Sequence, residues 1–158
     1  MLIIRDNEIF QKLMISIREN NTQRCTMLSS ELTSSRQTSR VVLSSCIALE
    51  RLMTKLSTAS AFGDLVIILG PAMAIIKTLR SSLTPYVPEM EAELGVVSEL
   101  LSGILVDAGQ VGGYIINFAE ANAQAVSHIE DASLAVDQKI EEDLPRIPEL
   151  PIVSLKLF

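Results

Sequence analysis

Residues 22–60 read TQRCTMLSSELTSSRQTSRVVLSSCIALERLMTKLSTAS and decide the fold. This stretch contains no glycine and no proline, and neither residue occurs anywhere before Gly63. Because glycine and proline are the strongest helix breakers, their absence predicts one helix over about 22–60, roughly 58 Å long at about 1.5 Å per residue. Fifteen of these residues are serine or threonine. Their helix propensity is modest, so this helix is expected to depend on packing against partners.

A shorter helix is expected before it, over about residues 3–19. Its apolar side chains recur at helical spacing: Ile9, Phe10, Leu13, Met14 and Ile17. Asn20 and Asn21 favour a turn, and Thr22 can cap the next helix through its hydroxyl. Two helices joined by so short a turn form an antiparallel hairpin, here over about 3–60.

The long helix separates into two faces when its residues are placed at about 100° intervals. The face expected to be buried carries Leu28, Val42, Cys46, Leu49 and Met53. The opposite face carries four cations, which we name the basic stripe: Arg36, Arg40, Arg51 and Lys55. The basic stripe is either an ordinary solvated face or a surface that meets anionic lipid or an acidic neighbour.

The middle of the chain predicts two shorter helices, over about 64–107. The third helix, to about Arg80, should bend or break at Gly70-Pro71. Its apolar run, residues 65–76, is too short to span a membrane and predicts either a buried helix or an interfacial segment. After a loop bounded by prolines, the fourth helix carries an apolar stripe: Leu94, Val97, Leu100, Leu101 and Ile104.

A glycine-rich joint is expected over 109–114, followed by an acidic amphipathic helix over about 115–142. The apolar positions of this fifth helix are Phe118, Ala125, Ile129, Val136 and Ile140. Its other faces are dominated by acidic residues, in keeping with the charge of the whole chain. Residues 1–80 have ten Lys/Arg and six Asp/Glu, whereas residues 81–158 have three and thirteen. A basic front half and an acidic back half indicate one of two things. They are either two differently charged solvated faces, or a basic half that attracts an anionic surface and an acidic half that masks it.

The composition argues against an enzyme, and no cofactor or metal is expected. Phosphate-binding, dinucleotide-binding and zinc-protease motifs are all missing. Cys46 is interpreted as part of the buried face, and His128 as a surface or boundary residue. Scattered aromatic residues give no platform for stacking bases, so nucleic acid is not an expected partner.

The carboxyl-terminal tail has the sharpest motif of the sequence, LPRIPELP over residues 144–151. Prolines at every third position favour polyproline II, which also repeats every three residues. Its prolines and apolar side chains can therefore present a preformed ridge to a groove on a partner. The alternative is a stiff tail without a partner.

The order of these segments resembles the ESCRT-III family, and more closely its archaeal cell-division (Cdv-type) members. The residues that carry the resemblance are RDNEIF at 5–10, ALERL at 48–52, FGDL at 62–65, Gly70-Pro71, PEM at 88–90 and Glu93-Leu94, with the proline tail. The likeness runs from about residue 5 to 108 and resumes at the tail. The first helix is several turns shorter than in the family, which implies a start further upstream or a variant shortened at its N-terminus.

The resemblance implies an all-α, non-enzymatic protein that polymerises at the cytoplasmic face of the cell membrane, at the division site. The implied segments are a core over 1–108, a hinge over 109–114, a regulatory helix over 115–142 and an MIT-interacting tail over 143–158. The family's tail is bound by the MIT domain of an AAA ATPase, and the positions here that match are Leu144, Pro145, Ile147, Pro148, Leu150 and Pro151. The basic stripe would face an anionic membrane or another ESCRT-III-like subunit, in a homo- or hetero-polymer. The acidic helix would fold back on the hairpin until subunits assemble.

One rival interpretation stays open at this point. The Ser/Thr-rich hairpin could dimerise as the coiled coil of a signalling or adaptor protein, whose proline tail binds an SH3-like groove.

Overall fold

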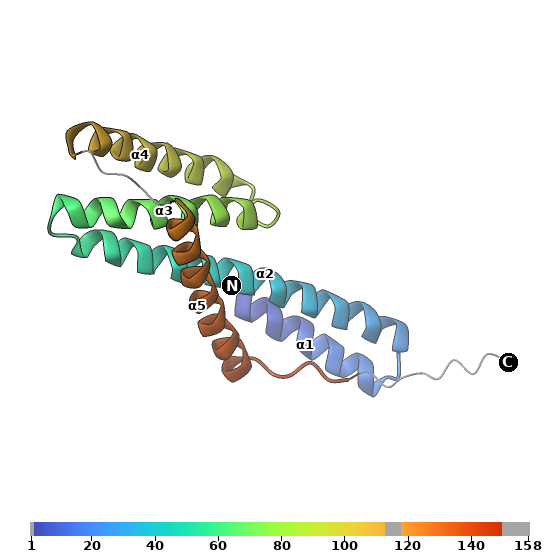
Figure 1. Ribbon diagram of the computed structural model, residues 1–158. Helices are drawn as coiled ribbons and strands as arrows, with labels where there is room; N and C mark the ends of the chain where they lie inside the picture. Colours follow the sequence, from blue (N-terminus) through green and yellow to red (C-terminus); the bar gives the residue numbers. More distant parts are fainter. Residues whose placement is uncertain (1, 113–117, 150–158) are drawn as a thin grey trace. The chain divides into compact units, whose positions relative to one another are not determined.

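The structure, a computed structural model, describes residues 2–112 and 118–149. These residues form helices and connecting segments without a strand, so the predicted all-α class is confirmed (Figure 1). The helices are α1 (Leu2–Arg18), α2 (Thr22–Thr58), α3 (Phe62–Leu83), α4 (Glu89–Gly112) and α5 (Phe118–Asp143). The chain divides into two compact units, which are described separately. The first unit comprises residues 1–39 and 139–158, and the second comprises residues 40–138.

In the first unit, a tight turn reverses the chain between α1 and α2. Asn20 adopts a positive φ of 54°, which asparagine tolerates better than most residues. The N–H of Asn21 donates to the carbonyl oxygen of Ser16 at 3.1 Å, and the Asn21 side chain accepts from the N–H of Arg24 at 3.1 Å. The turn is therefore where it was predicted, but the residue that caps α2 is Asn21 rather than Thr22.

The core of the first unit lies between α1 and the first half of α2. Its buried members are Ile9, Leu13, Cys25 and Leu32. The half-buried members are Phe10, Ile17, Leu28 and Ile147. The apolar stripe predicted for α1 is confirmed, because Ile9 and Leu13 are buried and the other three members are half-buried.

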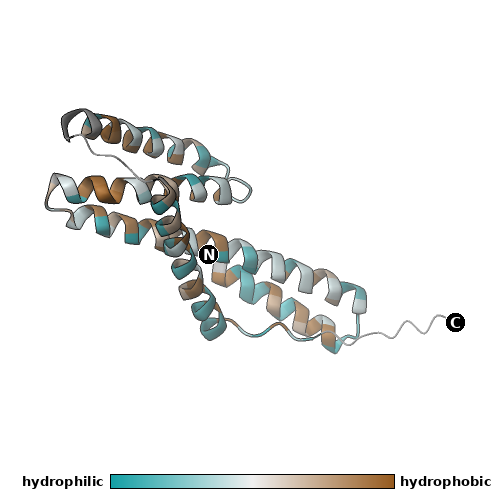
Figure 2. Cartoon of the chain, in the orientation of Figure 1, coloured by the Kyte–Doolittle hydropathy of each residue, from teal (hydrophilic) through white to brown (hydrophobic). Residues whose placement is uncertain are grey.

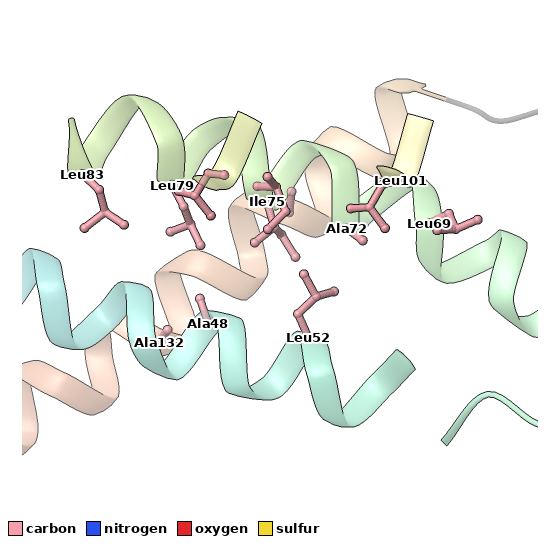
Figure 3. Close-up of a cluster of buried hydrophobic side chains, with 12 residues drawn as sticks. Ala48, Leu52, Leu69, Ala72, Ile75, Leu79, Leu83, Leu101 and Ala132 are labelled. Atoms are coloured by element: carbon pink, nitrogen blue, oxygen red, sulfur yellow. The ribbon is translucent and has the colours of Figure 1, made fainter. Parts of the chain in front are cut away.

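In the second unit, α3 is the main contributor to the core (Figure 3). It contributes six buried side chains: Leu69, Ala72, Ile75, Ile76, Leu79 and Leu83. By length and composition the segment Gly63–Leu83 could cross a membrane, and 39% of its most apolar stretch is buried inside the structure. The six buried side chains of α3 agree with the buried-helix interpretation. Its apolar character is visible in Figure 2. Of the two outcomes expected at Gly70-Pro71, a bend or a break, the break does not occur, since α3 continues through Pro71.

Helix α4 packs against α3 through a narrower stripe than the sequence suggested. Leu94, Leu101 and Ala108, seven residues apart, are buried. Val97, Leu100 and Ile104 belong to the predicted stripe but are exposed, Leu100 by 62%. A single helix neighbour covers only a seam of seven-residue period, which leaves the flanking apolar positions in water. Helix α4 also continues to Gly112, past the start of the joint expected at 109, and residues 113 and 114 lie outside the described part.

The buried face predicted for α2 is correct only in part, since three of its five members pack against a core. Leu28, Val42 and Leu49 are half-buried, whereas Cys46 is exposed and Met53 is 66% exposed. The buried positions are instead Cys25, Leu32, Ser39, Ser45, Ala48 and Leu52. At about 100° per residue these positions lie on two sides of α2, with Cys25, Leu32 and Ser39 on one side and Ser45, Ala48 and Leu52 on another. A buried hydroxyl there can be satisfied by the helix itself, since Ser45 donates to the carbonyl oxygen of Val41 at 2.7 Å.

The same internal bonding recurs along α2. Hydroxyls donate to the carbonyl oxygen four residues earlier at six positions, with oxygen–oxygen distances of 2.7 to 3.1 Å: Thr26, Thr33, Thr38, Ser45, Thr54 and Ser57. Much of the serine and threonine content of α2 is therefore turned inward onto its own backbone.

Candidate assembly and tail-docking surfaces

Arg36 does not belong to an exposed cationic surface. In the first unit its Nε and Nη2 donate to Oδ2 and Oδ1 of Asp6 on α1, at 2.7 and 3.0 Å. The two side chains are only 14% and 5% exposed. A bidentate pair at this depth ties the start of α1 to α2, so Arg36 is a structural residue in this arrangement.

Arg40 is also paired, but near the surface and in the second unit. Its Nε lies 2.6 Å from Oδ1 of Asp137 on α5, and its Nη2 donates to Oδ2 at 2.8 Å. Both side chains are about two-fifths exposed, at 43% and 38%. The carboxylate belongs to the acidic fifth helix, so Arg40 joins the basic α2 to the acidic α5. Solvent screens such a pair, and its contribution to stability is correspondingly small.

Two members of the basic stripe keep a free surface. Arg51 and Lys55 are exposed and make no ion pair with another described residue. They lie four residues apart, and therefore on one side of α2. The four cations that the sequence grouped together thus divide into two engaged residues and two available ones.

Helix α5 is anchored to α2 through a histidine that sequence reasoning placed at the surface. His128 is buried, with 9% of its area exposed, and its Nε2 lies 3.0 Å from the carbonyl oxygen of Ala48. A carbonyl oxygen can only accept, so Nε2 carries the hydrogen and donates. The expectation of a surface or boundary position is wrong, because a polar ring that can donate to the backbone is compatible with burial.

The face of α5 that is buried beside His128 is built from small residues. Ala121, Ala125, Ala132 and Val136 are all buried, and Ala125 and Ala132 belong to the same cluster as Ala48 (Figure 3). Of the five apolar positions predicted for this helix, Ala125 and Val136 are buried and Ile129 and Ile140 are half-buried. The side chain of Phe118 lies outside the described part. Alanines on both helices permit the short distance that the histidine hydrogen bond requires.

The proline tail leaves α5 without an intervening loop. The N–H of Leu144 still donates to the carbonyl oxygen of Ile140 at 3.0 Å, and the chain is non-helical from residue 145 to 149. Leu144, Ile147 and Pro148 are half-buried, whereas Pro145 and Arg146 are exposed. The side chain of Ile147 packs against the α1–α2 core of the first unit. Leu150 and Pro151, also expected to bind a partner, lie outside the described residues.

The described residues contain no cluster of histidine, cysteine and carboxylate side chains suited to a metal ion. Their charged side chains form ion pairs between helices or face solvent, and their apolar side chains form two separate cores. These features define an all-helical protein that leaves Arg51 and Lys55 of α2 exposed.

The chain is similar to two cell-division proteins of Sulfolobus acidocaldarius. It is 31% identical to Cell division protein B1 over 150 residues, which cover 95% of this chain and 70% of the relative. It is 24% identical to Cell division protein B over 147 residues, covering 93% of this chain but only 56% of that protein. No family model and no solved structure matches the chain. On the similarity to Cell division protein B1, the chain belongs to the archaeal Cdv-type ESCRT-III family.

Proposed function

We propose that this chain is a non-enzymatic, filament-forming subunit that remodels membranes in archaeal cell division. The observation that carries the proposal is the 31% identity, through 95% of the chain, to a protein named for cell division. The chain spans 70% of that relative and 56% of the second one, so the activity proposed for the whole protein goes beyond what the alignment covers.

The charge distribution supports assembly regulated by α5. Helix α5 contains seven acidic residues and one lysine, and it contacts the more basic α2 through Asp137 and Arg40. Among the contacts between these helices are a partly exposed ion pair, a hydrogen bond from His128 and a face of mostly small side chains. An interface of this kind can open at small cost. In the proposal, α5 leaves α2 when subunits assemble at the cytoplasmic face of the cell membrane.

The tail supports a link to an ATPase. Its Leu-Pro-x-Ile-Pro-x-Leu-Pro pattern resembles the second type of MIT-interacting motif, and we propose that it recruits the MIT domain of an AAA ATPase. The side chains that would fill the MIT groove are Leu144, Pro145, Ile147, Pro148, Leu150 and Pro151.

Electron microscopy of the full-length chain on anionic liposomes tests the proposal. Ala132→Glu places a carboxylate in the buried face of α5, where it has no room, and should release the helix. Leu134→Glu adds the same charge to the same helix at a position that is 66% exposed, and serves as the matched control. Filaments or tubules that increase with Ala132→Glu, and not with Leu134→Glu, would support a regulated membrane-remodelling polymer. A fixed dimer or tetramer with every variant, indifferent to lipid, would overturn it in favour of an adaptor coiled coil.

A further inference from the structure

We propose that α1 and the first half of α2 form a binding site for the chain's own proline tail, and that a tail bound there is unavailable to the ATPase. The second part rests on the tail function proposed above. The site, which we name the tail-binding face, consists of the apolar residues of the first unit's core: Ile9, Phe10, Leu13, Ile17, Cys25, Leu28 and Leu32.

The contact involves one of the side chains proposed to bind the MIT domain. Ile147 lies at the centre of the motif, between Pro145 and Pro148, and it packs on the tail-binding face. Leu144, three residues earlier, is half-buried as well, while the intervening Pro145 and Arg146 are exposed. Pro148, next to Ile147, is half-buried too. In an extended polyproline-like segment, positions 144 and 147 lie on one edge, which is also the edge that would face a partner's groove. Ile147, which packs on the tail-binding face, is therefore also one of the residues proposed to fill the MIT groove.

A side chain cannot occupy two grooves at once. While Ile147 lies on the tail-binding face, an MIT domain can bind only the fraction of molecules in which the tail is free. The apparent dissociation constant rises in inverse proportion to that fraction, so a tail docked nine-tenths of the time would bind about tenfold more weakly.

The covalent connection makes this internal site effective. The tail follows the last turn of α5 directly, through the hydrogen bond from Leu144 to Ile140. A tethered segment meets its site at a high effective concentration, so even a small apolar contact competes with a partner in solution. Changes at the tail-binding face should consequently alter ATPase binding without altering the motif itself.

The two cysteines provide an intrinsic test that needs no ATPase. Cys25 is 5% exposed and belongs to the core that Ile147 covers, whereas Cys46 is exposed. In a full-length Cys46→Ser background, the rate at which Ellman's reagent modifies Cys25 reports on access to the tail-binding face. We expect Ile147→Asp to raise this rate at least several-fold and Arg146→Asp, its exposed neighbour, to leave it unchanged. With helicity intact by circular dichroism, equal rates in the parent and Ile147→Asp would overturn tail docking.

A binding titration with an isolated MIT domain tests the competition. Phe10→Ala and Leu28→Ala weaken the tail-binding face and leave the motif intact, so each should bind the MIT domain several-fold more tightly than the parent. Unchanged affinity in both variants, with binding lost in Ile147→Asp, would overturn the competition while supporting the tail as the ATPase ligand. Absence of MIT binding in every variant, the parent included, would instead overturn the ATPase proposal, and the thiol rates alone would then decide whether the tail docks.

Discussion

Arg36 on α2 donates two hydrogen bonds to the carboxylate of Asp6 on α1, at 2.7 and 3.0 Å, and both side chains are nearly buried. Asp6 lies within the RDNEIF segment that carries part of the family resemblance, and Arg36 is the first cation of the basic stripe. The pair fixes how the two helices meet. It also removes one charge from the surface that the sequence offered to lipid or to another subunit.

Arg36→Ala should destabilise the protein by about 3 kcal/mol, because it leaves the Asp6 carboxylate buried without its partner. Urea denaturation followed by circular dichroism measures the change. Arg51→Ala, an exposed arginine on the same helix, should change the free energy of unfolding by no more than about 0.5 kcal/mol. Equal effects of the two substitutions would contradict the structural role of Arg36.

Truncation of two adjacent leucines on α4 should change the free energy of unfolding by very different amounts. Leu101→Ala empties a buried position against α3 and should cost about 2 to 4 kcal/mol, while Leu100→Ala, at a position 62% exposed, should be nearly neutral. Thermal melts of the two variants provide the comparison. A larger loss in Leu100→Ala would show that the register of α4 is displaced by one residue.

The cap of α2 can be assigned by a pair of substitutions. Asn21→Ala removes the side-chain oxygen that accepts from the N–H of Arg24 and should cost about 1 kcal/mol. Thr22→Ala removes a hydroxyl from the first residue inside the helix and should have a smaller effect, since alanine has the higher helix propensity. Unfolding free energies in the reverse order would restore Thr22 as the cap.

Binding to anionic membranes, where it occurs, should depend on Arg51 and Lys55. The double substitution Arg51→Glu and Lys55→Glu reverses the two available charges of the basic stripe and should reduce cosedimentation with anionic liposomes. Binding by the parent should also weaken as salt is raised from about 0.05 to 0.5 M. Arg18→Glu with Arg24→Glu makes the same change in net charge outside the stripe. A loss of the same size in that control would point to net charge rather than to this surface.

Sequence reasoning succeeded where a pattern depends on the chain alone. The absence of glycine and proline before Gly63 predicted the long second helix, and the two asparagines predicted the turn before it. The apolar stripe of α1 was also correct, because bulky residues such as Ile9 and Leu13 mark its single buried face.

Sequence reasoning failed where the burial of a side chain depends on another helix that packs over it. On α2 the bulky Met53 is exposed and the small Ala48 is buried, because burial depends on which side of α2 is covered by another helix. The histidine on α5 could not be placed from its own segment, because its acceptor lies eighty residues earlier in the chain. The division of the basic stripe has the same origin, as its carboxylate partners come from α1 and α5.

The hydroxyls of α2 that donate to their own helix affect how easily neighbouring helices can be exchanged on its surface. A polar surface ordinarily forms specific hydrogen bonds with whatever covers it, and those bonds must break before the neighbour can move. At Thr26, Thr33 and Thr38 the donors are already satisfied internally, so an adjoining helix that slides or departs forfeits few directional interactions. A neighbouring helix can therefore shift along α2 without breaking many hydrogen bonds. The surface of α2 stays polar, but it does not fix the register in which a neighbour packs on it.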